Sequence, residues 1–508
     1  MSASNGSSSI NAVLDASSMR RRAREIIDRQ TYKLMIGRSP GNTDGVEELD
    51  VSDPASGEVV AHVPLAGPNE VDSAVAAARR SFESGSWSRI VPAARARILW
   101  RTAELIEANA EELALTEALD AGKPLLSARQ IDIPQAAAHF RYQAAAAMRL
   151  DGHTIPISDS RVFNYTVFEP MGVVAAITPW NFPLVIAARS IAPALAAGNS
   201  VILKPAEETP LTSFRLAELM QEAGIPEGVL AVLSGTGESA GLPLACHNDV
   251  DKIVFTGSQD AARQIIRASA ANFKRLSLEL GGKSPAIVCE DADLSKSLPA
   301  LIIGAFSNQG QNCCAATRIL VHRERRDELA ETFIAATEQL KVGDNFESDT
   351  RVGPLITADH RARVEHYISE AVADGARILT GGQEPEVPGQ NGWFLTPAVI
   401  DEVNPRSPLA TEEVFGPCVT LEEFDNLDQA VAMANATTYG LAAGVFTDRS
   451  DTAQELSRRL RSGTIWVNCY ERFDAAAPFG GVKQSGYGHS IGHVAIKEFM
   501  DVKSVWLA

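Results

Sequence analysis

The chain contains 508 residues, of which 45% are hydrophobic and 22% charged, and its formal net charge is −18. This acidic balance argues against a nucleic-acid-binding surface, and no apolar run approaches the roughly 18 residues that a membrane span requires. The six cysteines include no CxxC pair, which is typical of reduced thiols, so we expect a cytoplasmic protein that binds neither nucleic acid nor membrane.

The N-terminal segment, residues 1–30, is expected to be an extension outside the folded domains. Residues 1–9 are rich in Ser, Gly and Asn and lack the apolar stretch of a secretory signal. Four arginines follow, and the segment as far as Gln30 is expected to form one short helix. The arginines would suit a transit peptide, but three acidic residues count against it: Asp15, Glu25 and Asp28. We therefore expect the extension to be either flexible or docked on the surface.

The following elements alternate between strand and helix. From Asn69 apolar residues recur near a period of 3.6, which predicts long helices, and residues 161–168 have the composition of a strand. We then predict strands at 172–177, 200–204, 229–233 and 251–255, and helices at 184–197, 211–223 and from about 261. A second α/β series runs from 284 to about 468, and a glycine-rich loop, a helix and a strand at 501–506 complete the chain. Such alternation is typical of parallel sheets covered by helices on both faces.

A polar, glycine-containing turn that ends in a thiol occupies residues 308–314, with the sequence Asn-Gln-Gly-Gln-Asn-Cys-Cys. Upstream, Glu279 leads into two consecutive glycines, Gly281 and Gly282, which we expect to give that carboxylate room to move. A cysteine nucleophile and a carboxylate base are what a two-stage reaction through a thioester requires. The thiol attacks a carbonyl carbon, and the carboxylate later takes a proton from the water that releases the acid.

A third segment, Thr178-Pro179-Trp180-Asn181-Phe182-Pro183, makes the combination specific. All three segments resemble the signature segments of the hydrolytic NAD(P)-dependent aldehyde dehydrogenase superfamily, from about Tyr32 to the C-terminus. The resemblance implies an α/β fold with three parts. These are a Rossmann-like NAD-binding domain (31–150 and 171–281), an α/β catalytic domain (282–483) and a small β oligomerisation element (151–170 and 484–508). That element would assemble a homodimer or a homotetramer.

The resemblance also assigns the catalytic residues. Cys313 is the implied nucleophile rather than Cys314, because it has the family's Gly-Gln-x-Cys spacing, and Cys314 is expected to face the core. A free thiol is only about 10% ionised at pH 7.5, so either helix amides or the nicotinamide ring should supply positive potential, or a base must take the proton. We expect a helix to follow this turn. Asn181 and the Cys313 backbone N–H would hold the oxyanion, and Glu279 would activate the thiol or the hydrolytic water.

NAD is the implied cofactor, and NADP is the less favoured alternative. Gly257 and Ser258 form a strand-to-helix turn that resembles the family's pyrophosphate site, although Ala262 stands where the family commonly has glycine. The GxGxxxG run at 234–241 is one residue too long for a Rossmann fingerprint. Lys204 and Glu207 would bind the ribose hydroxyls, and a carboxylate there disfavours a 2′-phosphate. The other implied cofactor-binding residues are Ile177, Thr178, Trp180, Gly237, Glu413 and Phe415.

The histidines predict no metal site. His489 and His493 have i, i+4 spacing, which we place on the C-terminal helix, but no third ligand accompanies them. The segment containing His489 and Ser490 also departs from the Gly-Arg-Glu-Leu-Gly usual in the family.

Substrate choice is the least specified feature. Arg189 lies eight positions after Asn181, where succinic semialdehyde and lactaldehyde dehydrogenases carry arginine, and Arg472 and Phe473 fall in the loop that lines the same entrance. These residues favour an anionic or oxygenated aldehyde, whereas the alternative is that Arg189 pairs with a carboxylate of the protein. Two further alternatives are a CoA-acylating semialdehyde dehydrogenase and a non-catalytic structural protein of the same fold, as in lens crystallins.

Overall fold

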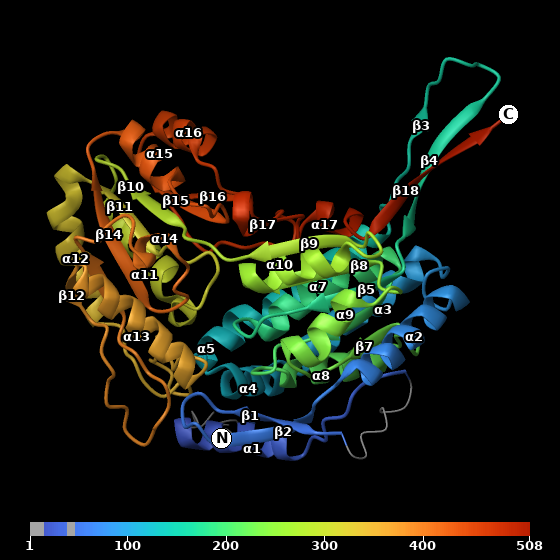
Figure 1. Cartoon of the computed structure of the whole chain (residues 1–508), viewed down its shortest axis with the longest axis horizontal. Coiled ribbons are helices and arrows are strands. Elements are labelled where there is room, and N and C mark those ends of the chain that lie inside the picture. The colour runs from blue at the N-terminus through green and yellow to red at the C-terminus, as the bar shows by residue number, and fades with distance from the viewer. Residues whose placement is uncertain (1–14, 38–45) are drawn as a thin grey trace, which may run out of the picture.

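The computed structural model describes residues 15–37 and 46–508, and shows two α/β lobes with a β-ribbon that projects from one of them (Figure 1). The N-terminal tail expected at residues 1–9 lies outside the described residues. Among those that are described, no helix combines the length and the apolar character needed to cross a bilayer. The strands and helices predicted between residues 172 and 269 are confirmed in their order, and their ends differ from the prediction by a few residues.

The first lobe is built on a six-stranded sheet of order β17-β9-β8-β5-β6-β7, parallel except for β17. Its strands are β5 (Val173–Ile177), β6 (Ser200–Lys204), β7 (Leu230–Val232), β8 (Lys252–Gly257), β9 (Arg275–Leu280) and β17 (Gly486–Tyr487). The helices of this lobe include α2 (Pro68–Ser84), α3 (Pro92–Ala108), α4 (Ala110–Ala121), α6 (Ile133–Ala147), α7 (Pro183–Ala197), α8 (Leu211–Ala223) and α10 (Gln259–Ser269).

Alternation of side chains along β5 explains why helices cover both faces of this sheet. Val174 and Ala176 point into the core formed with α3, α6, α7 and α8. Their neighbours Val173, Ala175 and Ile177 point into a second core, which contains residues of α2 and α10. Successive residues of a strand face opposite sides, so a strand that is apolar throughout must be covered twice.

The second lobe contains a seven-stranded sheet of order β12-β13-β14-β11-β10-β15-β16. Its strands are β10 (Pro285–Val288), β11 (Arg318–His322), β12 (Arg377–Thr380), β13 (Ala398–Asp401), β14 (Cys418–Phe424), β15 (Ala442–Phe446) and β16 (Thr464–Val467). The main helices are α11 (Leu294–Phe306), α12 (Arg326–Glu338), α13 (Ala358–Ala373), α15 (Leu427–Asn435) and α16 (Ser450–Arg459).

The projecting ribbon joins distant parts of the chain. It consists of β3 (Thr154–Ile155), β4 (Phe163–Pro170) and β18 (Met500–Leu507) (Figure 1). β18 pairs antiparallel with β4 from Met500 opposite Pro170 to Leu507 opposite Phe163, which confirms the predicted partnership of these two strands. Trp506 and Val502 are exposed on this ribbon.

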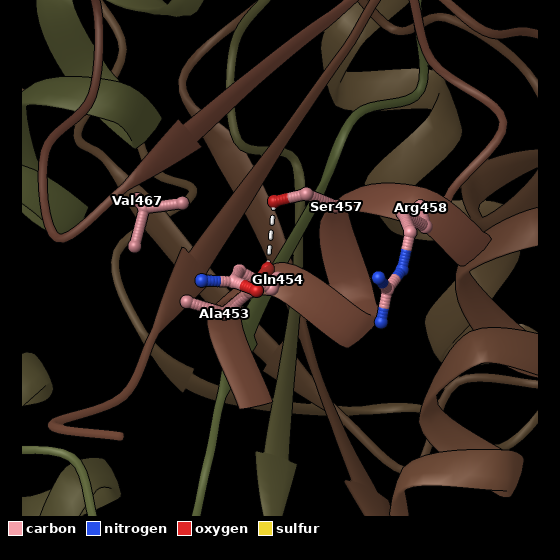
Figure 2. A pocket seen from close by; sticks show the side chains of 5 residues that line it. All are labelled: Ala453, Gln454, Ser457, Arg458 and Val467. Atoms are coloured by element: carbon pink, nitrogen blue, oxygen red, sulfur yellow. Dashed lines mark hydrogen bonds between the residues drawn. The ribbon is translucent and has the colours of Figure 1, made fainter. Parts of the chain in front are cut away.

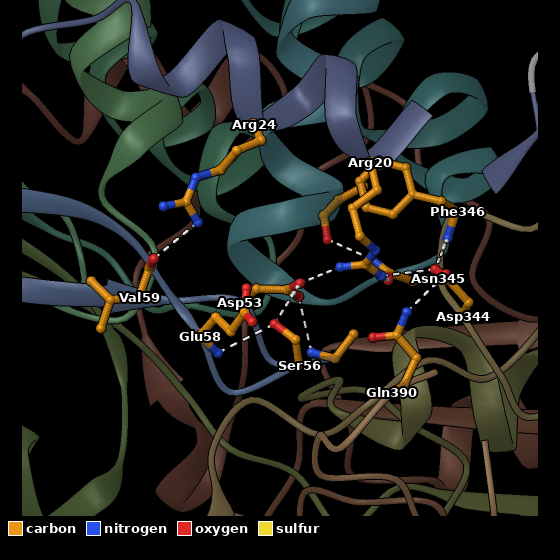
Figure 3. Close-up of polar contacts among 12 residues, drawn as sticks. Arg20, Arg24, Asp53, Ser56, Glu58, Val59, Asp344, Asn345, Phe346 and Gln390 are labelled. Atoms are coloured by element: carbon orange, nitrogen blue, oxygen red, sulfur yellow. Dashed lines mark hydrogen bonds and ion pairs between the residues drawn. The ribbon is translucent and has the colours of Figure 1, made fainter. Parts of the chain in front are cut away.

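The N-terminal helix α1 (Ala16–Asp28) is docked on the body of the protein. Arg20 donates to Asp53, and its Nη2 donates to the Asp344 and Asn345 side-chain oxygens at 2.8 Å each (Figure 3). The same guanidinium lies 4.8 Å from the centroid of the Phe346 ring. One half-buried arginine therefore ties the helix to both a loop after β1 (Glu48–Ser52) and the loop that follows α12.

Candidate active site

The predicted nucleophile turn has an unusual backbone. Asn308, Gln309 and Gly310 have successive φ angles of 49°, 60° and 67°, and non-glycine residues rarely adopt this left-handed conformation without strong local restraint. The restraint is visible, because Asn308 Nδ2 donates to the Asn181 carbonyl at 3.0 Å and Gln309 Nε2 donates to the Pro354 carbonyl at 3.0 Å. A Cβ on Gly310 would lie 2.2 Å from the Gly416 carbonyl oxygen, so only glycine fits there.

The two adjacent cysteines differ in accessibility. Cys313 is partly exposed, whereas Cys314 is 1% exposed and packs in the core of the second lobe, as the sequence predicts. Contact with Cys313 and burial raise the pKa of the Cys314 thiol well above its usual value. The turn continues into strand β11 and not into a helix, so the prediction of a helix after Cys313 is wrong. The positive potential expected at this thiol therefore does not come from a helix that follows it.

Asn181 is buried beside the nucleophile turn. It follows β5 and precedes α7, and its Nδ2 donates to the Gln311 carbonyl at 3.0 Å. Asn181 is thus bonded to the turn twice, because its side chain donates to Gln311 and its backbone carbonyl accepts from Asn308 Nδ2. A side-chain amide nitrogen carries two hydrogens, so a second donor remains beyond the bond to Gln311.

Glu279 occupies the end of β9, where β17 pairs with it through Gly486. The residue is 4% exposed, and in the described part of the chain neither carboxylate oxygen has a hydrogen-bond partner. Burial raises the pKa of Glu279 to about 7, against the opposing effects of the Arg189 charge and the Ser490 hydroxyl. A buried carboxyl that titrates near neutral pH is suited to general-base catalysis.

The predicted phosphate site lies where β8 turns into α10. Ser258 caps the helix, because its Oγ accepts from the Ala261 N–H at 3.2 Å, and Gly257 precedes it at the strand end. The helix begins at Gln259, two residues earlier than predicted. Ala262 is 1% exposed and packs in the core beneath the helix, so its methyl group faces the sheet side and not the helix N-terminus.

Lys204 and Glu207 form an ion pair at the end of β6, with 2.9 Å between Nζ and Oε2. The lysine side chain is only 4% exposed, so this is not an ordinary surface pair. Ile177 and Thr178 end the adjacent strand, and the Thr178 N–H donates to the Lys204 carbonyl at 3.0 Å. The Thr178 hydroxyl is buried without a partner among the described residues, and such a group fits a ligand bound at this strand edge.

Gly237 begins a short π-helical turn, Gly237–Gly241, which Thr236 caps. The glycine is exposed, and a Cβ built on it would meet no atom within 4 Å among the described residues. The structure thus leaves open space at Gly237 but brings no other candidate residue into contact with it.

The remaining cofactor candidates are Glu413, Trp180 and Phe415, and the last two are in contact with each other. Glu413 accepts from the Gly282 N–H at 3.0 Å, and burial raises the pKa of Glu413 to about 7. Trp180 and Phe415 form an edge-to-face pair with centroids 5.2 Å apart. Phe415 has a φ of 62°, and its carbonyl lies 2.7 Å from His360 Nε2, so a histidine stabilises the strained residue.

Arg189 lies on α7 and is 8% exposed. Its Nε and Nη2 have no hydrogen-bond partner in the described ranges, so at these two nitrogens the alternative of pairing with a carboxylate of the protein is not observed. The guanidinium lies 5.6 Å from the Phe479 ring centroid, and Phe479 in turn contacts Phe473 at 5.3 Å. Arg472 is exposed, and the structure does not bring it against Arg189.

The predicted helical placement of the two histidines is wrong. Helix α17 spans His493–Lys497, and the left-handed Gly492 separates it from His489. The two histidines therefore do not share a helix face.

A surface depression beside α16 contains none of the predicted site residues (Figure 2). Its lining consists of Ala453, Gln454, Ser457, Arg458 and Val467.

Sequence reasoning missed several residues that support the site. His360 packs against Trp180 with ring centroids 5.4 Å apart. Asn312 and Glu471 form a hydrogen bond beside the thiols at 2.6 Å. Their sequence signals are weak, since Asn312 is one polar residue in a polar turn and Glu471 is adjacent to residues noted only for their loop.

Comparison with known proteins agrees with this arrangement. Residues 42–505 match the model of the "Aldehyde dehydrogenase family". The chain is 43% identical to the aldehyde dehydrogenase DhaS of Bacillus subtilis, covering 94% of this chain and 96% of DhaS. It is also 43% identical to the mitochondrial benzaldehyde dehydrogenase of Antirrhinum majus, covering 94% and 89% of the two chains.

A solved structure supports the same assignment. The NAD⁺ complex of aldehyde dehydrogenase from Bacillus cereus superposes with a TM-score of 0.93 at 39% identity, covering 96% of this chain and 98% of that chain. The predicted fold and the predicted family are both confirmed. The chain belongs to the aldehyde dehydrogenase family.

Proposed function

We propose that this protein oxidises an aldehyde to a carboxylic acid with NAD, through a thioester on Cys313. The observation that carries the proposal is the convergence of three distant segments. Asn181 donates to the Gln311 carbonyl at 3.0 Å, and a Cβ on Gly282 would lie 2.3 Å from the Cys313 carbonyl oxygen. The oxyanion donor and the strand end that carries Glu279 thus both abut the turn that carries the nucleophile.

The residues act in the following order. The Cys313 thiolate adds to the aldehyde carbon, and the second Asn181 N–H and the Cys313 N–H bind the resulting oxyanion. Such a donor lowers the barrier by about 3–4 kcal/mol. Loss of a hydride from that carbon, which bound NAD would accept, leaves a thioester on Cys313. Glu279 takes a proton from water, the hydroxide adds to the thioester carbon, and the C–S bond breaks to release the acid and the thiolate.

The strand edge at β5 and β6 is the proposed cofactor site. The ion pair with buried Lys204 holds the Glu207 carboxylate in place, where it would accept a hydrogen bond from a ribose hydroxyl and repel a 2′-phosphate. Ser258 and Gly257 would meet the pyrophosphate at the N-terminus of α10. Glu413 would bind the second ribose, and Trp180 and Phe415 would lie beside the nicotinamide.

For the substrate we propose an anionic or oxygenated aldehyde. Arg189 supports this choice, because two nitrogens of its buried guanidinium lack the hydrogen-bond compensation that a buried cation needs. A substrate carboxylate or hydroxyl would supply it. Phe473 lies two aromatic contacts from Arg189, and exposed Arg472 would attract anions to the entrance. Water rather than CoA is the proposed acyl acceptor, because Glu279 is present as a base.

The domain division, the oligomeric state and the cellular location are also proposals. The division into a cofactor domain, a catalytic domain and an oligomerisation element follows the two sheets and the ribbon. The exposed edge of β18, with Trp506 and Val502, is the proposed surface for a homodimer or homotetramer. The proposed location is the cytoplasm, although some relatives, among them the benzaldehyde dehydrogenase of Antirrhinum majus, are named as mitochondrial.

The test is an NADH absorbance assay at 340 nm with NAD and a panel of aliphatic, aromatic, amino- and carboxy-aldehydes, with and without CoA. We expect NADH and free acid to form in equal amounts without CoA. Acyl-CoA formed in preference to the acid would identify a CoA-acylating enzyme. No turnover with any aldehyde, in protein that still binds NAD, would favour the structural protein.

A further inference from the structure

The loop after β16 contains a second acidic residue near the nucleophile, which the proposed reaction does not use. Glu471 has a left-handed φ of 52°, and Asn468, three residues earlier, has the same angle. Asn468 is fixed by two hydrogen bonds with the Thr447 backbone, at 2.8 and 3.0 Å. Two non-glycine residues in this conformation within four positions indicate a loop whose shape is imposed by its contacts.

Those contacts join Glu471 to the nucleophile turn from two directions. One carboxylate oxygen accepts from Ser307 Oγ at 2.5 Å, directly after helix α11, and the other accepts from Asn312 Nδ2 at 2.6 Å. Both bonds are short, as is usual for hydrogen bonds to a carboxylate. Burial raises the pKa of Glu471 to about 7, and the bonds from Ser307 and Asn312 oppose that rise.

The hydrogen bond that Asn312 Nδ2 donates to Glu471 determines which way the Asn312 side-chain amide points. Because the amide nitrogen faces Glu471, Asn312 Oδ1 must face the thiols. It accepts from the Cys314 N–H at 3.3 Å and from Cys314 Sγ at 3.2 Å, and lies 3.9 Å from Cys313 Sγ. An acceptor at this position stabilises and orients the S–H form of a thiol.

We propose that Glu471 is a positioning residue that holds the Cys313 thiol in its resting orientation through Asn312. Glu471 precedes Arg472 and Phe473, so a displacement of this loop by substrate would pass through Asn312 to the nucleophile. The inference rests on the proposed role of Cys313. The charged groups on the neighbouring elements, Arg189 on α7 and Glu279 on β9, are unchanged by the tests below.

The first measurement is the rate of Cys313 alkylation by iodoacetamide as a function of pH, with the modified residue identified by mass spectrometry. Glu471→Ala and Asn312→Ala should each move the midpoint of this profile to lower pH, since the first releases and the second removes the Asn312 oxygen that favours S–H. The control Glu338→Gln, on the exposed end of α12, should leave it unchanged. A Glu471→Ala midpoint equal to the native one would overturn the proposal.

The second measurement is kcat/KM for the best aldehyde. Glu471→Ala should lower it by about tenfold or more, the usual effect of losing a hydrogen bond to a charged group. Glu471→Gln keeps an acceptor for Asn312 and should lie close to native. The double variant with Asn312→Ala should be no worse than Asn312→Ala alone, because one residue acts through the other; additive losses would contradict this.

Two safeguards keep the test decisive. If Glu471→Ala does not fold, the alkylation midpoint is measured on Asn312→Ala, and kcat/KM is measured on Glu471→Gln. A native alkylation midpoint in Asn312→Ala would then overturn the proposal. Alkylation needs neither aldehyde nor NAD. Native protein that oxidises aldehydes, with unaltered alkylation in the variants, would thus reject the role of Glu471 while leaving the proposed function intact.

Discussion

The backbone of Gly282 lies directly against the carbonyl oxygen of Cys313, with 2.3 Å between that oxygen and the position of a Cβ on Gly282. A Cβ on Gly281 would likewise lie 1.9 Å from Glu413 Oε2. The two glycines therefore allow three chain segments to meet beside Glu279. Sequence reasoning expected these glycines to let the carboxylate move, and the structure adds that any side chain here would separate the base from the nucleophile.

Replacement of Cys313 tests the nucleophile. Cys313→Ala should abolish aldehyde oxidation, because no other thiol can form the thioester, and NAD affinity should stay within a few-fold of native. Cys314→Ala is the matched control and should keep most activity, since Cys314 is buried in the core. Steady-state NADH formation and equilibrium NAD binding measure both. An inactive Cys314→Ala beside an active Cys313→Ala would reverse the assignment.

Replacement of Glu279 separates the two stages. Glu279→Gln should still give a pre-steady-state burst of NADH, whereas its steady-state rate should fall by about 10²–10⁴, the usual contribution of a general base. Because the pKa of Glu279 is raised to about 7, the native deacylation rate should rise with pH between 6 and 8, and the variant's rate should not. Loss of the burst would instead assign Glu279 to thiol activation.

The same variant should alter stability in a pH-dependent way. A folded pKa of about 7 lies above the ordinary value of 4.5, so folding disfavours the ionised form of Glu279 and this penalty is absent below pH 4.5. At pH 8 its removal in Glu279→Gln is worth up to about 3 kcal/mol. The variant's melting temperature should exceed the native one at pH 8, and the gap should close towards pH 5. Equal gaps at both pH values would contradict the burial argument.

Cofactor preference depends on Glu207. Native kcat/KM should be at least about tenfold higher with NAD than with NADP, because a hydrogen bond to a charged group is worth about 1.5–3 kcal/mol. Glu207→Ser should narrow that ratio, whereas Glu222→Ser, on the exposed surface of α8, should not change it. Equal native efficiency with both cofactors would show that the 2′-phosphate is accommodated despite the carboxylate.

Substrate charge should be sensed by Arg189. Arg189→Leu should lower kcat/KM for a semialdehyde acid more than for its uncharged analogue of equal length, because only the former loses a charge-assisted hydrogen bond. The expected difference is about tenfold or more. Arg458→Leu, on the exposed face of α16, serves as the control. If both substrates lose the same factor, the tunnel selects by shape and not by charge.

Elements with regular periodicity were predictable from the sequence, and strained segments were not. β5, β6 and β8 are short apolar runs whose composition and spacing allow little else, and α10 has its cap in the sequence at Ser258. The helix expected after Cys313 is absent because three left-handed residues end α11 and redirect the chain into β11. Propensity describes the usual conformation of a residue and therefore misses one imposed by distant contacts.

In the candidate site, too, some features were predictable from the sequence and others were not. Cys313, Glu279 and Asn181 lie in recognisable segments, and the structure brings those segments together. Asn312 donates a hydrogen bond to Glu471, more than 150 positions away in the sequence, and the support of Phe415 depends on His360 in helix α13. Contacts of this kind depend on the packing of the lobes and carry no local signal. The separation of His489 from α17 has a visible cause only in the φ of Gly492.

The left-handed run Asn308–Gly310 has a practical consequence for directed evolution. Gly310 has no room for a methyl group beside the Gly416 carbonyl. The side-chain amides of Asn308 and Gln309 each donate a hydrogen bond that stabilises the left-handed backbone. Random codons at these positions would mostly yield misfolded clones and lower the useful fraction of a library. Diversity placed instead at exposed side chains such as Arg472 would change the entrance without replacing the residues that hold the turn. A library should therefore keep these three residues fixed and vary exposed residues that do not contact the turn.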